Sequence, residues 1–444
     1  MIILTNTLRE SYRMVGLDRI IDKAKRDSKC KFTSLVHLVN AENLKSSFSQ
    51  LKEGKASGVD LVTKESYGQN LCGKIEELIV KLKNKKYRPQ PVRRAYIPKV
   101  GSDEKRMLGI PTIEDKMVQS NVKEILESIY ETVFLDFSYG FRPGRSCHKA
   151  IKALDHCVMT KPINYVVEVD IRKFFDNVQH DWMMRCLKER IADKNLLWII
   201  ERFLKAGVME EGNYLESESG TPQGGVISPL LANIYLHYVL DLWFEKKIKP
   251  KARGHIEMMR YCDDFVVCCE SEADAKEFLE QLKERFEKFG LKVAEEKTRL
   301  IKFGRKGWRL AEKQELKPET FNFLGFTHYG KKSRKGYWVM SHKTIKTTLS
   351  RKLKEIKEYI KSIRNIAPLE NWWPTLKSKL RGHINYFGIS GNYHCLEQFR
   401  YGVILTAFKW INRRSQKRSM NWEQYVRFMG FNPLPQSRIC YALY

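Results

Sequence analysis

Arg260-Tyr261-Cys262-Asp263-Asp264-Phe265-Val266-Val267 is the stretch that decides the fold. Apolar residues precede and follow the two acids, a pattern that predicts a strand, a tight turn and a second strand, with both carboxylates at the turn. Adjacent anions repel each other, so such a pair is most stable where a divalent cation neutralises it. Mg²⁺ held by carboxylates and substrate phosphates is a common arrangement of this kind. An isolated Asp-Asp pair is more often a solvated turn.

A second run strengthens the metal-binding interpretation. Val166-Val167-Glu168-Val169-Asp170 places an aspartate at the end of an apolar strand, followed by Ile171-Arg172-Lys173-Phe174-Phe175-Asp176. Asp170 lies 93 positions before Asp263, so the two acidic segments would belong to different strands of one sheet. Three carboxylates on two buried strands are what two-metal phosphoryl transfer requires.

The composition predicts a nucleic-acid partner. The 444 residues are 43% hydrophobic, enough to bury two or three domain cores. Lys and Arg total 80 against 52 Asp and Glu, giving a net charge of +28, and residues 331–444 hold 23 of these bases and 5 of the acids. An anionic membrane is the alternative partner, but no lipidation motif or basic amphipathic arm is evident. The C-terminal quarter is therefore expected to be a binding module.

Cysteine usage and hydropathy favour a soluble protein of a reducing cytoplasm. The 10 cysteines form no Cys-x-x-Cys pair and no Cys/His cluster at zinc-finger spacing, so neither a disulfide framework nor a zinc ribbon is expected. The apolar run at residues 1–4 is too short for a signal peptide, and no stretch approaches the length of a membrane span.

Hydrophobic periodicity predicts helices, then a mixed α/β core, then a basic helical module. A hairpin is expected over residues 93–111, and strands at 292–293, 300–303 and 321–326. Helices are expected at residues 41–51, 71–86, 114–134, 180–190, after Pro229, and at 272–289, 344–363, 372–387 and 395–413.

Several segments suit contacts with a nucleotide or a nucleic-acid backbone. In Gly220–Pro229 the glycines permit close backbone approach to a flat ligand, and Gln223 could hydrogen-bond a nucleotide or base-pair edge; a structural turn is equally plausible. Arg142 and Arg145 surround a Pro-Gly turn and suit sugar–phosphate contacts, with a solvated turn as the alternative. Lys99 and Arg106 flank the hairpin turn, where they could clamp a triphosphate or simply be exposed charges.

Two further residues have candidate roles near the acids. Phe175, five residues beyond Asp170, could exclude a ribose 2′-hydroxyl, although core packing is the simpler reading. Lys297 follows a strand and could protonate a departing pyrophosphate, or form a surface salt bridge. In the C-terminal module, aromatic residues interleave with Lys and Arg, which suits backbone tracking and base stacking. The cluster from Arg413 to Arg418, which includes Arg414, fits contact with DNA or RNA, or a solvated helix end.

In this order, the segments resemble the group II intron-encoded reverse transcriptase/maturase family over nearly the whole chain. The resemblance is carried by the segments already quoted and by residues 106–111, 139–146, 220–233, Phe323-Leu324-Gly325-Phe326 and Leu380-Arg381-Gly382-His383-Ile384-Asn385-Tyr386. It implies an α+β right-hand polymerase, with fingers, a palm built on a βαββαβ-like sheet, and an all-α basic thumb or maturase domain. The implied boundaries are 1–90 for an N-terminal extension and start of the fingers, 91–335 for fingers and palm, 336–414 for the thumb, and 415–444 for a short DNA-binding segment.

The resemblance also implies roles for residues. Asp170, Asp263 and Asp264 would bind two Mg²⁺ ions, for which Mn²⁺ could substitute, and the Ile171 carbonyl would complete one site. The remaining residues would contact dNTP (Lys99, Arg106, Phe175, Gln223, Lys297), primer and template (Arg142, Arg145, Cys262, Phe323, Leu324, Gly325) and intron RNA through the thumb (Arg381, His383, Arg413, Arg414). Cys262 departs from the alanine usual in the family.

The implied function is RNA-directed DNA synthesis on an RNA template with a DNA primer or target, combined with help to intron splicing and mobility by target-primed reverse transcription. The chain resembles the shorter members without an appended endonuclease. A domesticated polymerase acting in repair or phage defence and a splicing-only maturase are the alternatives. Monomer and dimer both remain open.

Overall fold

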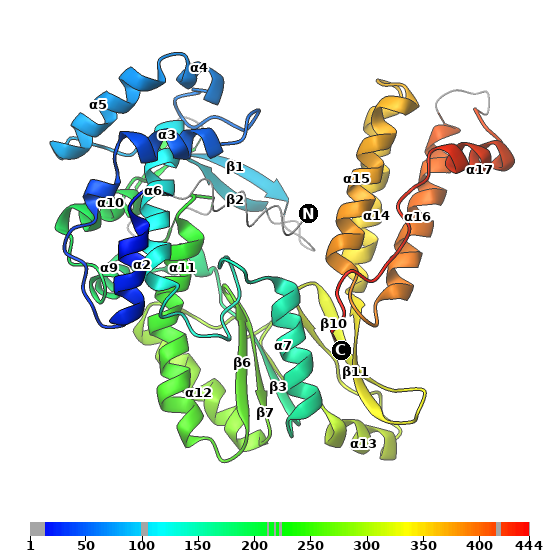
Figure 1. Ribbon diagram of the computed structural model, residues 1–444. Helices are drawn as coiled ribbons and strands as arrows, with labels where there is room; N and C mark the ends of the chain where they lie inside the picture. Colours follow the sequence, from blue (N-terminus) through cyan, green and yellow to red (C-terminus); the bar gives the residue numbers. More distant parts are fainter. Residues whose placement is uncertain are drawn as a thin grey trace.

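The computed structural model describes residues 14–98, 105–210, 213–216, 219–221, 224–413 and 419–443, apart from the side chains of Pro98 and Arg106. Its three lobes are arranged as an open hand, with fingers and thumb rising on either side of a palm (Figure 1). This arrangement confirms the expected α+β class. No helix in these ranges is both long and apolar enough to cross a membrane.

The fingers lobe combines helices with a small sheet. Its helices are α2 (Leu17–Arg26), η1 (Val36–Leu38), α3 (Ala41–Gln50), α4 (Lys64–Gly68), α5 (Leu71–Lys83) and α6 (Ile113–Tyr130). The strands β1 (Val92–Pro98) and β2 (Lys105–Ile110) form the expected hairpin, and β4 (Val208–Glu210) and β5 (Asn213–Leu215) extend the sheet in the order β2-β1-β4-β5. Helix α6 begins where the Thr112 hydroxyl accepts a hydrogen bond from the Asp115 amide, 3.2 Å away, as an N-cap residue does.

The palm contains the expected βαββαβ order. Strand β3 (Tyr165–Asp170) is followed by helices, then by β6 (Ile256–Tyr261), β7 (Asp264–Cys269), α12 (Glu272–Lys288) and β8 (Arg299–Lys302), and the sheet order is β6-β7-β3-β8 with antiparallel pairs throughout. The helical elements between β3 and β6 are α8 (Phe174–Asn177), α9 (His180–Lys188), α10 (Lys194–Leu204), α11 (Ser228–Leu236), η2 (His237–Asp241), η3 (Phe244–Ile248) and η4 (Lys249–Lys251).

The two faces of the palm sheet carry different helices. Because side chains alternate along a strand, Val167 and Phe265 face the core that includes Phe278 of α12, whereas Val166 and Cys268 face the opposite side. Helix α7 (Cys147–Thr160) packs on that second side. Asp170 and Asp264 have the same parity as Val166 and Cys268, so they point to the α7 side as well.

A three-stranded sheet connects palm to thumb. It consists of β9 (Phe321–Phe323), β10 (Phe326–Lys332) and β11 (Trp338–Thr344), and follows the short helix α13 (Arg305–Lys313). The single strand expected over 321–326 is therefore wrong, because Leu324 (φ 49°) and Gly325 (φ 82°) turn the chain between β9 and β10. The boundary expected at residue 336 falls between β10 and β11, which pair over their full length, and it stays a prediction.

The thumb is a helical bundle of α14 (Lys346–Ile363), α15 (Leu369–Phe387), α16 (Tyr393–Ile411) and α17 (Trp422–Phe431). The separate segment expected over 415–444 is not distinct in its described part, because Tyr425 and Leu434 are buried in the same core as Trp372. The chain then returns to the base of the thumb, where Tyr441 stacks on His148 of α7 with ring centroids 3.7 Å apart. Whether residues 415–444 bind DNA stays a prediction.

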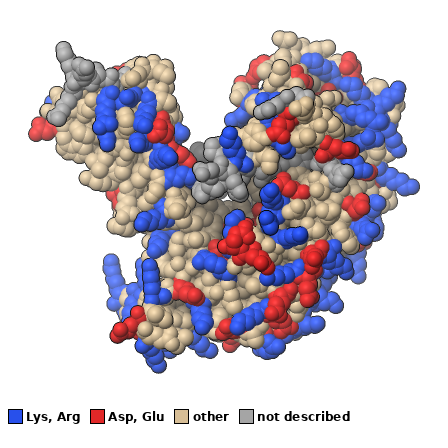
Figure 2. Space-filling view, turned by 180° about the vertical axis from the view of Figure 1, so that it is seen from behind, with Lys and Arg blue, Asp and Glu red and all other residues tan. Residues whose placement is uncertain are grey.

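Basic side chains cover much of the molecule. Seen from behind, a hollow separates the upper thumb from the fingers, and Lys and Arg are spread over both lobes (Figure 2). This distribution suits a partner that lies between the lobes and contacts each of them through its phosphates.

Candidate active site

The sheet register brings the predicted carboxylates together. Asp170, the last residue of β3, lies directly opposite Asp264, the first residue of β7, and Asp263 occupies the turn before it. The turn is tight, since Tyr261 pairs with Asp264 and leaves only Cys262 and Asp263 in the loop. Cys262 is buried with φ 60°, a left-handed conformation that favours glycine.

Buried contacts hold this turn in place. The Arg260 guanidinium is fully buried and donates to the Cys262 carbonyl at 2.9 Å, to Asn233 Oδ1 at 3.0 Å and to both carboxylate oxygens of Asp241. A side chain on Gly140 would place its Cβ 2.4 Å from the Cys262 nitrogen, so the two backbones are in direct contact. The turn between β6 and β7 is therefore held by a closed network of buried hydrogen bonds.

Charge repulsion between the carboxylates is strong. Burial, followed by the negative charges of Asp263, Asp170 and Glu168, raises the pKa of Asp264 to about 7. Lys297 partly offsets this charge, because its Nζ lies 3.1 Å from Asp170 Oδ2, with about half of each side chain exposed. Within the described residues, the oxygens of the three carboxylates do not all come within 4.8 Å of one another.

The donor set fits a divalent cation. Three carboxylates with an unfavourable accumulation of negative charge are typical of sites that hold hard cations through oxygen ligands. Buried Ile171 continues β3 and forms an isolated bridge with Val293. The backbone of this segment therefore lies beside the acids, as the expected carbonyl ligand requires.

The nucleotide side of the site is partly described. Phe174 is buried in the core, and Phe175 is only half-buried, in T-shaped contact with it. The Thr221 amide donates to the Phe175 carbonyl at 2.8 Å, so the Gly-rich loop starts against the expected sugar gate. Lys99 and Gln223 lie outside the described residues, as does the side chain of Arg106, whose backbone belongs to β2.

The β9–β10 turn reaches the carboxylates. A backbone hydrogen bond from Leu324 to the Asp264 carboxylate lowers the pKa of that group against the larger effect of burial. Tyr386 of the thumb donates its hydroxyl to the Leu324 carbonyl at 3.1 Å. Phe323 is buried. A Cβ added to Gly325 would lie within 4 Å of the Tyr386 and Phe387 rings. The turn thus links palm acids to thumb, in keeping with the expected position at a primer end.

Two of the residues expected to contact nucleic acid are buried. Arg142 is buried, and its guanidinium donates to Glu131 at 2.7 Å and to the carbonyls of Leu135 and Ser138, also at 2.7 Å each, so it is not available to a phosphate. His383 is only 6% exposed and stacks on Phe399 with ring centroids 3.6 Å apart. Burial lowers the pKa of His383 to about 4, and the expected RNA contact of this residue stays a prediction.

The other expected cations remain accessible to different degrees. Arg145 is half-buried and pairs with Asp136 at 2.6 Å, while Arg381 and Arg413 are exposed. Arg414 lies outside the described residues. Their binding roles stay predictions. Sequence reasoning missed Arg260, Asp241 and Gly140. The one available signal was Arg260 itself, since a lone charge in an apolar strand requires a buried partner.

Comparisons with known proteins agree with this geometry. Residues 97–328 match the family described as reverse transcriptase (RNA-dependent DNA polymerase), which spans more than half of the chain. The group II intron-encoded protein LtrA of Lactococcus lactis subsp. cremoris is 32% identical, with 76% of this chain and 67% of that protein covered. Protein YkfC of Escherichia coli (strain K12) is 37% identical over 46% of this chain and 54% of its own length.

A mitochondrial relative extends the comparison beyond bacteria. Nuclear intron maturase 1, mitochondrial, of Arabidopsis thaliana is 32% identical over 21% of this chain and 13% of its own length. The matched reverse transcriptase region contains both acidic strands and the turn at Leu324. From its palm carboxylates and these relationships, the chain belongs to the reverse transcriptase family, as an RNA-directed DNA polymerase of the group II intron reverse transcriptase/maturase type.

Proposed function

We propose that Asp170, Asp263 and Asp264, with the Ile171 carbonyl, hold two Mg²⁺ ions for DNA synthesis from dNTPs on an RNA template. The observation that carries the proposal is the direct pairing of Asp170 with Asp264 across the palm sheet, beside Asp263. When bound, two such ions activate the attacking 3′-oxygen and stabilise the departing pyrophosphate. Mn²⁺ would fit the same oxygen ligands.

The chain's own residues would orient the reactants. Lys297 is close enough to the carboxylates to reach a phosphate near them, either to neutralise it or to donate a proton. Phe175 would lie against the sugar, where its half-buried ring leaves no room for a 2′-hydroxyl. The Leu324–Gly325 turn would hold the primer terminus, because it contacts Asp264 and the thumb at once.

We further propose that the thumb binds intron RNA and thereby assists splicing and target-primed mobility. Its support is the excess of 23 basic over 5 acidic residues in 331–444, together with relatives that are named as an intron-encoded protein and an intron maturase. Arg381 and Arg413 are exposed on this lobe, so they are the first candidates for phosphate contacts. The ten free cysteines suit a reducing cytoplasm.

Primer extension tests the polymerase proposal. An RNA template with an annealed DNA primer, dNTPs and Mg²⁺ should be copied by the wild-type chain and by Asp22→Ala, a matched loss of an exposed carboxylate on α2. Asp263→Ala should extend no primer while keeping its affinity for the template–primer. Extension by Asp263→Ala would refute the assignment of the site.

A splicing assay separates the maturase proposal from catalysis. With a group II intron RNA as probe, Asp263→Ala should still promote splicing, whereas the double variant Arg381→Ala/Arg413→Ala should bind the RNA less tightly and with a smaller dependence on salt. Unchanged binding by the double variant would overturn the proposed thumb contact.

A further inference from the structure

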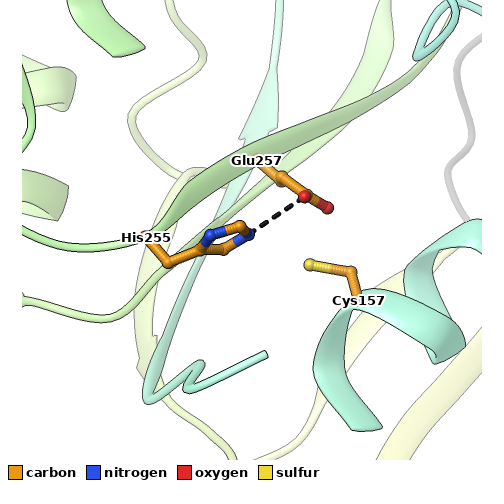
Figure 3. Close-up of side chains that lie close together, drawn as sticks. All are labelled: Cys157, His255 and Glu257. Carbon is orange, nitrogen blue, oxygen red and sulfur yellow. Dashed lines mark ion pairs between the residues drawn. The ribbon is translucent and has the colours of Figure 1, made fainter. Parts of the chain in front are cut away.

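A second group of metal-binding side chains lies at the far end of the palm sheet. Cys157 on α7, His255 just before β6 and Glu257 on β6 place one donor atom each within 4.8 Å of one another (Figure 3). No other set of three His, Cys, Asp or Glu residues in the described part of the chain is as close. Cys157 lies about 100 positions before His255 and Glu257 in the sequence, so no short spacing motif predicts the cluster.

The donors are oriented toward a common point. His255 Nε2 is 3.0 Å from Glu257 Oε1, yet this buried nitrogen has no partner in hydrogen-bond geometry. The Cys157 sulfur points toward the same place in Figure 3. A ring nitrogen shielded from water and lacking a hydrogen bond is an unfavourable arrangement that a coordinated cation would resolve.

A second thiol lies on the neighbouring strand, on the same side of the sheet, although its sulfur is not within 4.8 Å of all three donor atoms. Cys268 of β7 pairs with Glu257 across the sheet and therefore points to the same side. It is fully buried, and its thiol contacts that of Cys157.

We propose that Cys157, His255 and Glu257, with Cys268 as fourth ligand, bind one Zn²⁺ ion. Thiolate, imidazole and carboxylate are the ligands that Zn²⁺ accepts in tetrahedral sites, and a set containing sulfur disfavours Mg²⁺. The ion would join α7 to the β6–β7 hairpin. This site lies far from the polymerase carboxylates. Cys268 is four positions along β7 from Asp264, a distance of roughly 13 Å.

The proposed role is structural. The hairpin that presents Asp263 ends, at its other end, in Glu257 and Cys268, and α7 carries Tyr441 and the C-terminal chain on His148. A cation fixed between the two elements would hold the palm sheet against the base of the thumb. Binding must release one proton from each thiol that coordinates the ion, so affinity for Zn²⁺ should increase with pH.

Metal analysis of the full chain tests the proposal. After removal of metal with a chelator and dialysis against Zn²⁺, the wild type should retain about one ion per chain and melt about 5 °C higher than the metal-free protein. With Co²⁺ in place of Zn²⁺, a sulfur-to-cobalt charge-transfer band should appear in the near ultraviolet.

Variants locate the ion. His255→Ala, at a partly exposed position, and Cys157→Ser should lose the retained ion and the cobalt band. His156→Ala, next to Cys157 but exposed, and Cys186→Ser, a buried cysteine on α9, should keep both. Asp263→Ala should also keep its Zn²⁺, which separates this site from the polymerase site. Retention of Zn²⁺ by folded His255→Ala, or no stoichiometric Zn²⁺ in the wild type, would overturn the proposal.

Discussion

His328 Nδ1 of β10 lies 2.8 Å from His342 Nδ1 of β11, and both rings are fully buried. His328 Nε2 faces the Phe323 carbonyl at 3.3 Å, and His342 Nε2 lies 3.0 Å from Asp155 Oδ1 on α7. A carbonyl only accepts hydrogen bonds, so His328 donates from Nε2 and accepts at Nδ1. His342 then donates from Nδ1 to His328, and its Nε2 shares a proton with the Asp155 carboxyl group.

This series of hydrogen bonds connects the β9–β10 turn to the palm. It runs from α7 through two strands to the residue that precedes Leu324, whose amide contacts the Asp264 carboxylate. Burial and the charge of His342 lower the pKa of His328 well below its usual range, in agreement with its neutral state. A substitution at Asp155 should therefore alter the position of the Leu324 turn beside Asp264.

Asp155→Asn is the first variant that we would examine. The amide disturbs the buried hydrogen bond to His342 Nε2, and a buried polar group left without its partner costs about 1–3 kcal/mol. The free energy of unfolding should fall by that amount in denaturant titration, and the KM for template–primer should rise. Glu245→Gln, which breaks an exposed i,i+4 pair with Lys249, should cost below about 1 kcal/mol. Equal losses for the two variants would contradict a structural role for the buried contact between Asp155 and His342.

Gly140→Ala should displace the catalytic turn. The added methyl group would lie 2.4 Å from the Cys262 nitrogen and 2.9 Å from the Tyr261 carbonyl carbon, so backbone must move. We expect kcat for primer extension to fall by at least about 100-fold, because small misplacements of catalytic groups have such effects. Gly430→Ala on α17, where nothing lies within 4 Å, should leave kcat unchanged. A fully active Gly140→Ala would show that the turn tolerates the shift.

Asp264→Asn should stabilise the metal-free protein at high pH. The pKa of Asp264 is about 7 when folded and near its ordinary 3.8 when unfolded, so the folded protein binds more protons between these values. The free energy of unfolding therefore falls as pH rises from about 4 to 7, by of the order of 2–4 kcal/mol. The variant should escape this loss, and its melting temperature should exceed that of the wild type at pH 8 but not at pH 4.

Added divalent cation supplies the control for Asp264→Asn. A bound cation stabilises the ionised wild-type carboxylates, so the advantage of the variant at pH 8 should shrink with increasing Mg²⁺. A difference in melting temperature that changes with neither pH nor Mg²⁺ would mean that burial and the neighbouring carboxylates do not raise the pKa of Asp264.

Lys297→Ala distinguishes a catalytic contact from a surface salt bridge. Its Nζ is 3.1 Å from Asp170 Oδ2, but about half of both side chains is exposed, so the pair should stabilise the fold by below about 1 kcal/mol. If the ammonium acts on the nucleotide phosphates, single-turnover incorporation should slow by about 10- to 100-fold. Lys205→Ala, which breaks the exposed pair with Glu201, should have no such effect. An unchanged incorporation rate would leave Lys297 as a surface residue.

Local sequence patterns predicted the elements well where one physical signal dominated. The alternating and apolar runs around Asp170 and Asp263 predicted β3, β6 and β7, and the 3.6-residue period predicted the thumb helices α14, α15 and α16, but not α17, to within a few residues. Errors arose where a local conformation broke a continuous apolar run, as at Leu324 and Gly325, whose positive φ values interrupt the strand expected over 321–326. Arg142 was misjudged because its type suggests phosphate binding, whereas its burial depends on Glu131 and on carbonyls that only folding brings near.

The sequence by itself determined the chemistry of the polymerase site and the order of its elements, because strand and helix periodicity and paired acids are local properties. Tertiary structure alone decided which polar groups meet. Asp170 opposes Asp264 through strand register, Arg260 reaches Asp241 inside the palm, and Cys157 joins His255 and Glu257 across about 100 residues. Such contacts arise when distant segments pack together, and the spacing of residues along the sequence does not predict them.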